Sequence, residues 1–140
     1  MFGNGVIYTV NICVRLGVII IIFLAGLNAK KHDLLYRSLE TYLAKYKQSI
    51  ESDDITMKNG IFRLEMHGRR TNIKSQLLLG FYSVGRVLQK SSTPFREVQI
   101  VINYDLKDRQ MVLAKAPLEK VLDLSQNRLS SEQFFVIIGY

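Results

Sequence analysis

The chain contains one long apolar run, from Leu16 to Leu27, in which twelve consecutive positions have no polar side chain. Such a run predicts a segment that enters a membrane, either as part of a spanning helix or as the apolar core of a secretory signal. Twelve helical residues rise about 18 Å, which is less than the roughly 30 Å of a bilayer's hydrocarbon core. The run therefore needs a longer helix around it, or a role other than spanning.

The first interpretation is a transmembrane helix from about Gly5 to Asn28, which would be about 36 Å long. It places Arg15 near the middle of the span, at a cost of about 2.5–3.5 kcal/mol. The Leu, Ile, Val and Phe residues of the same segment favour insertion by about 4–8 kcal/mol in total, so insertion is expected. Arg15 would then snorkel to the lipid head groups or pair with a carboxylate of another subunit.

The second interpretation is a cleaved secretory signal, whose apolar core is the same run and whose n-region ends at Arg15. Cleavage requires small residues at the last position of the signal and two positions before it. Ala29 has Leu27 two positions earlier, and Ala25 has Phe23, so neither position fits. We therefore predict an uncleaved anchor.

The charges beside the run favour neither orientation clearly. Arg15 precedes the apolar run, whereas Lys30, Lys31 and Arg37 follow it. If the span covers residues 5–28, the positive-inside rule places the rest of the chain in the cytoplasm. If the shorter run acts as a signal-anchor, the rest of the chain is exported. We favour export, because it keeps Arg15 at a membrane interface.

We expect the anchor to occupy residues 1–29 and one small domain to occupy residues 30–140. All 12 acidic residues and 18 of the 19 basic residues follow the anchor, so the domain carries a net charge of +6. This charge favours anionic partners such as lipid head groups or an acidic face of another subunit. The single cysteine, Cys13, lies in the anchor, which excludes a disulfide, a thiolate metal site and a cysteine nucleophile in the domain.

The strongest local signal in the domain is Asn59-Gly60, because these residues supply the two positive φ values of a type I′ hairpin turn. Apolar periodicity predicts the remaining elements. These are a helix over Asp33–Ile50, strands over 55–58 and 61–66, a helix capped by Thr71 or Asn72 and running to Lys90, strands over 97–104 and 110–116 with a turn over 105–109, a helix over 118–124, and a final helix over 134–138.

The final run, 134–138, fits a helix or a strand, and we take it as a short helix because Ser130 and Gln133 form a capping box before it. The order of the elements predicts an α+β domain. We expect one antiparallel sheet, built from two hairpins and covered by helices on one face, without a parallel βαβ unit.

The side chains that carry most enzyme chemistry are sparse in this chain. His32 and His67 are the only histidines, and neither has carboxylates at the spacing of a metal site. No phosphate loop and no G-x-S-x-G sequence is present. We therefore expect no catalytic residues, no metal and no cofactor, and the chain is not expected to be an enzyme.

One cluster of basic residues falls between a predicted strand and a predicted helix. Arg69, Arg70 and Lys74 lie where side-chain cations and backbone N–H groups can hold a phosphate or a carboxylate. A solvated connection that adds only solubility explains the same residues. Nucleic acid is disfavoured as a ligand, because a nucleic-acid module needs aromatic side chains beside its basic groups on an exposed face, whereas Tyr36, Tyr42 and Tyr46 lie on or near the core-facing stripe of the first predicted helix.

These observations favour a non-enzymatic, single-pass membrane protein whose α+β domain docks partner proteins, as a small accessory subunit of a membrane complex. One alternative is a module that binds an anionic ligand or lipid head groups through Arg69, Arg70 and Lys74. Another is a soluble exported protein that remains after removal of a signal peptide.

Overall fold

The structure is a computed structural model of the 140-residue chain. It describes the backbone of residues 5–92, 94–105 and 109–140, and within these ranges it does not describe the side chains of residues 5–20, 22–25, 105 and 109. The chain forms two compact units, Met1–Leu34 and Leu35–Tyr140, which are described separately below.

The first unit contains most of helix α1 (Gly5–Ala44). Among the side chains that the structure describes there, Ile21 and Leu27 are exposed, with exposed fractions of 66% and 51%. Within the described part of the chain, no helix combines the length and the hydropathy needed to cross a bilayer. Arg15 and most of the apolar run lie outside the described side chains, so the anchor stays a prediction.

In the second unit, the last three turns of α1 bury Leu35, Leu39 and Leu43. The helix ends at Ala44, six residues before the predicted end at Ile50. The chain leaves the helix through Lys47, which has a φ of 57°. The Lys47 amide donates to the Ala44 carbonyl (3.0 Å) and the next amide donates to the Leu43 carbonyl (3.2 Å), which is a Schellman ending. Lysine is uncommon at such a left-handed position, so this helix end could not be predicted from the residue type.

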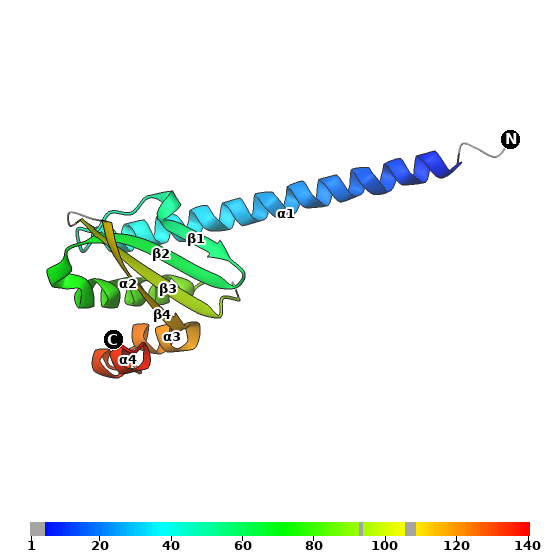
Figure 1. Ribbon diagram of the computed structural model, residues 1–140. Helices are drawn as coiled ribbons and strands as arrows, with labels where there is room; N and C mark the ends of the chain where they lie inside the picture. The colour runs from blue at the N-terminus through cyan, green and yellow to red at the C-terminus, as the bar shows by residue number, and fades with distance from the viewer. Residues whose placement is uncertain (1–4, 93, 106–108) are drawn as a thin grey trace. The chain divides into compact units, whose positions relative to one another are not determined.

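Two hairpins follow, as predicted (Figure 1). Strands β1 (Ile55–Lys58) and β2 (Ile61–Gly68) pair antiparallel around Asn59 and Gly60, whose φ values are 54° and 74°. Strands β3 (Glu97–Asp105) and β4 (Arg109–Pro117) also pair antiparallel. The turn predicted between them lies partly outside the described residues. Short 3₁₀ helices η1 (Ser52–Asp54) and η2 (Arg70–Asn72) precede β1 and α2.

The prediction of an antiparallel sheet is wrong for its central pair. The sheet is mixed, with the order β1-β2-β3-β4, and β2 runs parallel to β3 from Ile61 beside Glu97 to Gly68 beside Tyr104. The reason is the length of helix α2 (Ile73–Leu88). An eight-residue strand rises about 26 Å and a 16-residue helix about 24 Å, so α2 returns the chain to the end of the sheet at which β2 began. The next strand must then run in the same direction.

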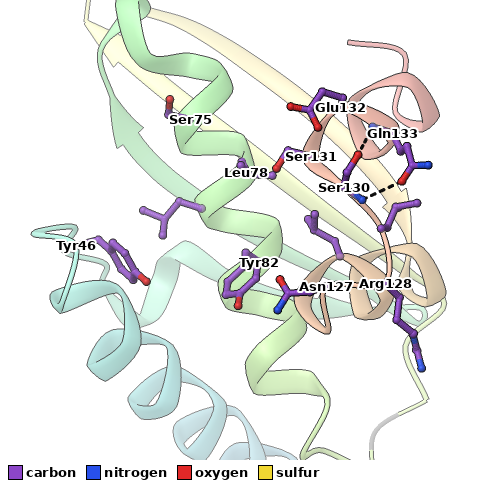
Figure 2. A pocket seen from close by; sticks show the side chains of 13 residues that line it. Tyr46, Ser75, Leu78, Tyr82, Asn127, Arg128, Ser130, Ser131, Glu132 and Gln133 are labelled. Atoms are coloured by element: carbon purple, nitrogen blue, oxygen red, sulfur yellow. Dashed lines mark hydrogen bonds between the residues drawn. The ribbon is translucent and has the colours of Figure 1, made fainter.

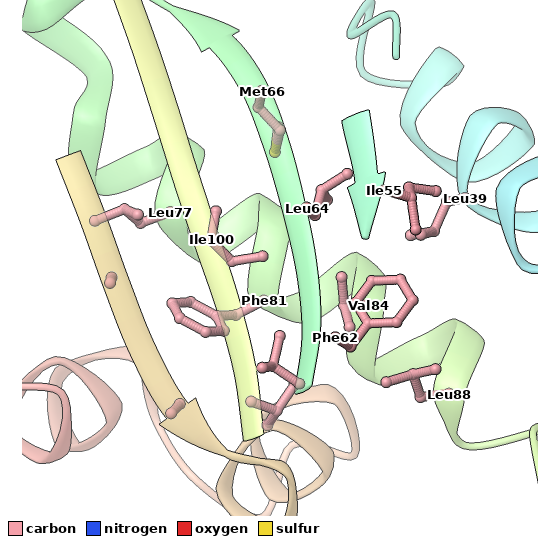
Figure 3. Close-up of a cluster of buried hydrophobic side chains, with 14 of the residues drawn as sticks. Leu39, Ile55, Phe62, Leu64, Met66, Leu77, Phe81, Val84, Leu88 and Ile100 are labelled. Carbon is pink, nitrogen blue, oxygen red and sulfur yellow. The ribbon is translucent and has the colours of Figure 1, made fainter. Parts of the chain in front are cut away.

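Helices α2, α3 (Leu118–Ser125) and α4 (Ser131–Ile137) supply the rest of the core together with the end of α1. Figure 3 shows how side chains from α1, α2 and the strands meet in one cluster. The Phe81 and Phe134 rings pack edge to face at 5.0 Å, which joins α4 to α2. The short final helix and its capping box are confirmed, because the Gln133 amide donates to Ser130 Oγ and the Ser130 amide donates to Gln133 Oε1.

Helix α2 also packs very closely against α3 at Gly85. A Cβ built there would lie 2.7 Å from the Val121 carbonyl oxygen and 2.7 Å from Ser125 Cβ. At Gly80 the nearest atoms belong instead to the side chains of Ile100 (2.9 Å) and Met66 (3.1 Å). A backbone carbonyl in a helix has less room to move than the end of a side chain. An added methyl group should therefore be tolerated better at Gly80 than at Gly85.

We predict that Gly85→Ala lowers the free energy of unfolding by about 1–3 kcal/mol, because overpacking against α3 outweighs the better helix propensity of alanine. Gly80→Ala should cost less, because side chains can adjust there. The exposed α2 residue Ser75 gives the control, since Ser75→Ala should change stability by less than about 0.5 kcal/mol. Urea unfolding in mild detergent, followed by near-ultraviolet circular dichroism, measures all three. Equal stability of Gly85→Ala and wild type would contradict the packing.

Candidate functional site

An open groove of about 950 Å³ runs along the outer surface of the helices in the second unit. Its floor is the outward side of α2, formed by Ser75, Leu78, Leu79 and Tyr82. Figure 2 shows α2 passing between Tyr46 on one side and the segment 127–133 on the other. The groove therefore has a floor and two walls.

The floor exists because α2 carries two apolar stripes. Leu77, Phe81 and Val84 face the sheet and are completely buried. Leu78 and Leu79 are only partly buried: they pack against the edge of the core and also line the groove. Positions 75, 78, 79 and 82 follow the i, i+3, i+4, i+7 spacing of a second helical face. This second face therefore leaves Leu78, Leu79 and Tyr82 partly accessible on the floor of the groove.

The wall opposite Tyr46 is held by local hydrogen bonds. Asn127, with a φ of 57°, ends α3 in a second Schellman motif, in which the Arg128 amide donates to the Asp123 carbonyl (2.8 Å). Arg128 also forms an ion pair with the Asp123 carboxylate at 2.8 Å. The capping box of Ser130 and Gln133 fixes the start of α4. These contacts form this wall without any ligand.

Cations lie over the aromatic rings at the groove and beside it. The Arg86 guanidinium lies 5.5 Å from the Tyr82 ring centroid. The Lys45 amine lies 5.7 Å from the Tyr42 ring, which is 5.8 Å from the Tyr46 ring. These contacts have the geometry of cation–π interactions. They hold positive charge close to the apolar floor and to its tyrosine wall.

Tyr42 is partly buried beside the Tyr46 and Tyr82 rings. Burial, followed by a hydrogen bond with Tyr46 and the proximity of Tyr82, raises the pKa of Tyr42 above its ordinary value of 10.0, although Arg86 acts in the opposite direction. The phenol is therefore neutral at physiological pH. It contributes a hydrogen-bonding group and an aromatic face to the cluster, but no charge.

The three residues of the predicted anion site lie around the start of α2, with Arg69 and Arg70 at η2 and Lys74 in the first turn of the helix. Arg69 and Arg70 are exposed in the connection between β2 and α2. The Lys74 amine lies instead over the Phe135 and Tyr140 rings, at 5.7 Å from each centroid. These rings belong to α4 and the residues after it, so Lys74 contacts the C-terminal segment. The predicted side-chain cap of α2 is also absent, since Asn72 is the N-cap residue but its side chain accepts no capping hydrogen bond.

The described residues include no cluster of three or more His, Cys, Asp or Glu side chains that could hold a metal ion. His67 is exposed near the end of β2, where its carbonyl accepts a hydrogen bond from Gln48 Nε2 at 2.7 Å. The residues that line the groove were not predicted as a site. The signal that could have found them is the second set of positions in α2, 75, 78, 79 and 82, which share one side of the helix.

Comparison with known proteins gives no family for this chain: it matches no protein-family model, no curated protein and no solved structure. The groove and its charges therefore have to be interpreted from their own chemistry.

The raised pKa of Tyr42 predicts a pH dependence of stability. A group whose pKa is higher in the folded state stabilises the fold below the unfolded pKa of about 10, and this contribution is lost as pH rises through the folded pKa. Tyr42→Phe should therefore reduce the fall in stability above pH 10. Tyr140→Phe, which removes an exposed hydroxyl, is the matched control. Urea midpoints at pH 7 to 11 measure the effect, and identical slopes for wild type and Tyr42→Phe would contradict it.

Proposed function

We propose that this protein is a non-enzymatic, single-pass membrane protein whose α+β domain docks partner proteins, as a small accessory subunit of a membrane complex. The observation that carries the proposal is the groove over α2. Its apolar floor, formed by Leu78, Leu79 and Tyr82, is partly accessible to solvent, and local hydrogen bonds hold the wall opposite Tyr46 in place. Binding of a partner there would remove this apolar surface from water.

The tether is proposed from the sequence of the first unit. The apolar run Leu16–Leu27 supplies most of the insertion free energy, and the 24 positions from Gly5 to Asn28 provide about 36 Å in a helix. In the arrangement that we favour, the Leu16–Leu27 run is an uncleaved signal-anchor, Arg15 lies near a membrane interface and the domain lies on the exported side. If the helix spans residues 5–28 instead, Arg15 lies at membrane depth, where it would pair with a carboxylate on a neighbouring subunit, and the domain lies in the cytoplasm.

The non-enzymatic part of the proposal is supported by the contacts of the polar side chains at the groove, several of which bind one another. Ser130 and Gln133 satisfy each other in the capping box, and Arg128 is paired with Asp123. A general acid or base needs a pKa near the working pH, whereas the raised pKa of Tyr42 moves that phenol further from neutrality. The groove thus presents apolar surface with positive charge at its edge, which suits binding.

The test is purification of the native protein from its membranes in mild detergent. We expect the chain to stay with the membrane through a high-salt wash, to have an intact mass that includes the Leu16–Leu27 run, and to co-elute with partner proteins in constant stoichiometry. A soluble product that begins near Lys30 would contradict the tether. A monodisperse monomer without partners would contradict the docking role.

A further inference from the structure

We propose that the groove over α2 binds an amphipathic helix of a partner protein, and that acidic residues flank the apolar face of that helix. This inference rests on the docking function proposed above and specifies the partner's chemistry. Its two parts, the helical form and the acidic flanks, follow from different observations.

The helical form follows from the elements that line the groove. The lining comes from α2, from the end of α3, from the first turn of α4 and from the turns after α1 and α3, and it includes no strand among the described residues. An extended peptide gains most of its affinity by pairing with a strand edge, which is not available here. The floor from Ser75 to Tyr82 is two helical turns, about 11 Å long, and its outward stripe has the spacing against which a second helix packs.

The openness of the groove argues against a small ligand as the natural occupant. Small-molecule sites bury 70–90% or more of their ligand. Here Ser75 and Tyr46 are exposed, and the floor is bounded only by walls at its sides. A bound segment would keep one side in water. This arrangement fits a helix that has one apolar face and a solvated opposite face.

The acidic flanks follow from charge complementarity. Three cations surround the lining without belonging to it: Lys45 lies over the Tyr42 ring, Arg86 over the ring of the floor residue Tyr82, and Lys74 of α2 over the Phe135 and Tyr140 rings. Among the described residues, no carboxylate forms an ion pair with any of these three cations. Of the two charged residues in the lining, Arg128 is already paired with Asp123, and Glu132 is the only acidic one. Carboxylates beside the apolar face of the partner helix would therefore meet unpaired cations.

The net charge of the chain argues against a second copy of this chain as the occupant. The whole chain has a formal net charge of +7, so two copies repel each other. A partner helix rich in Glu or Asp would be attracted over the Debye length of about 8 Å at physiological ionic strength.

The inference is tested with synthetic helical peptides and the full chain in phosphatidylcholine nanodiscs. The probe is a labelled 18-residue peptide with Leu at helical spacing on one face and Glu on both flanks. One matched peptide carries Lys on the flanks, and another has a central Pro that breaks the helix. Fluorescence anisotropy, corrected with empty nanodiscs, gives the affinities. At low salt the Glu peptide should bind about tenfold or more tightly than either matched peptide.

Variants then assign the binding to the groove. Leu79→Asp on the floor should weaken binding of the Glu peptide by about tenfold or more. Arg86→Glu should weaken it by about fivefold and should strengthen binding of the Lys peptide. Arg86 is exposed, so this variant tests the inference even if Leu79→Asp does not fold. The controls are Lys115→Glu, which makes the same charge change at an exposed position of β4, and Leu113→Asp on the same strand. Both should change the affinity by less than about twofold.

Equal binding of the Glu and Lys peptides would overturn the acidic flanks, and equal binding of the Pro peptide would overturn the helical form. A loss of binding as large in the controls as in Arg86→Glu would remove the groove as the site. If the peptides fail while native partners still co-purify, the inference is wrong and the proposed docking function stands. If no partner co-purifies, it is the docking function that falls.

Discussion

The parallel pairing of β2 with β3 is the constraint on which the rest of the second unit depends. Two parallel neighbours need a crossover, and α2 provides it with a length that matches the strands. The crossover puts α2 against the central strands β2 and β3, and the outer strands β1 and β4 flank this central pair (Figure 1). One helix, α2, therefore supplies both buried side chains of the core and the floor of the groove.

This dual use of α2 links stability to the candidate site. The inner stripe is fully buried at Leu77, Phe81 and Val84, and the outer stripe stays partly exposed at Leu78 and Leu79. The close approach of α3 at Gly85, together with the Phe81–Phe134 contact, sets where the segment 127–133 can lie. The wall of the groove is thus fixed by core packing. Changes in the core are expected to alter the site even when they are made away from its lining.

Much of the fold could be predicted because its signals are local. Asn59-Gly60 determines the first hairpin, and the Ser130–Gln133 capping box determines the start of α4. The strand direction could not be predicted from such signals, since it depends on how far α2 carries the chain before β3 begins. The end of α1 was missed because a lysine, Lys47, occupies a left-handed position that usually favours glycine. The groove could not be predicted, because apolar residues such as Leu78 and Leu79 are expected in a core, and their partial exposure depends on how α2 packs against the sheet.

The central claim is that α2 presents its outer stripe to a partner protein in the native membrane. Photo-crosslinking tests this claim most directly, with a benzophenone side chain at Ser75 on the groove floor or at Thr56 on β1, which are both exposed. The account predicts one defined crosslinked product from Ser75 and none from Thr56. Crosslinking from Thr56 but not from Ser75 would place the partner on another surface and would contradict the account.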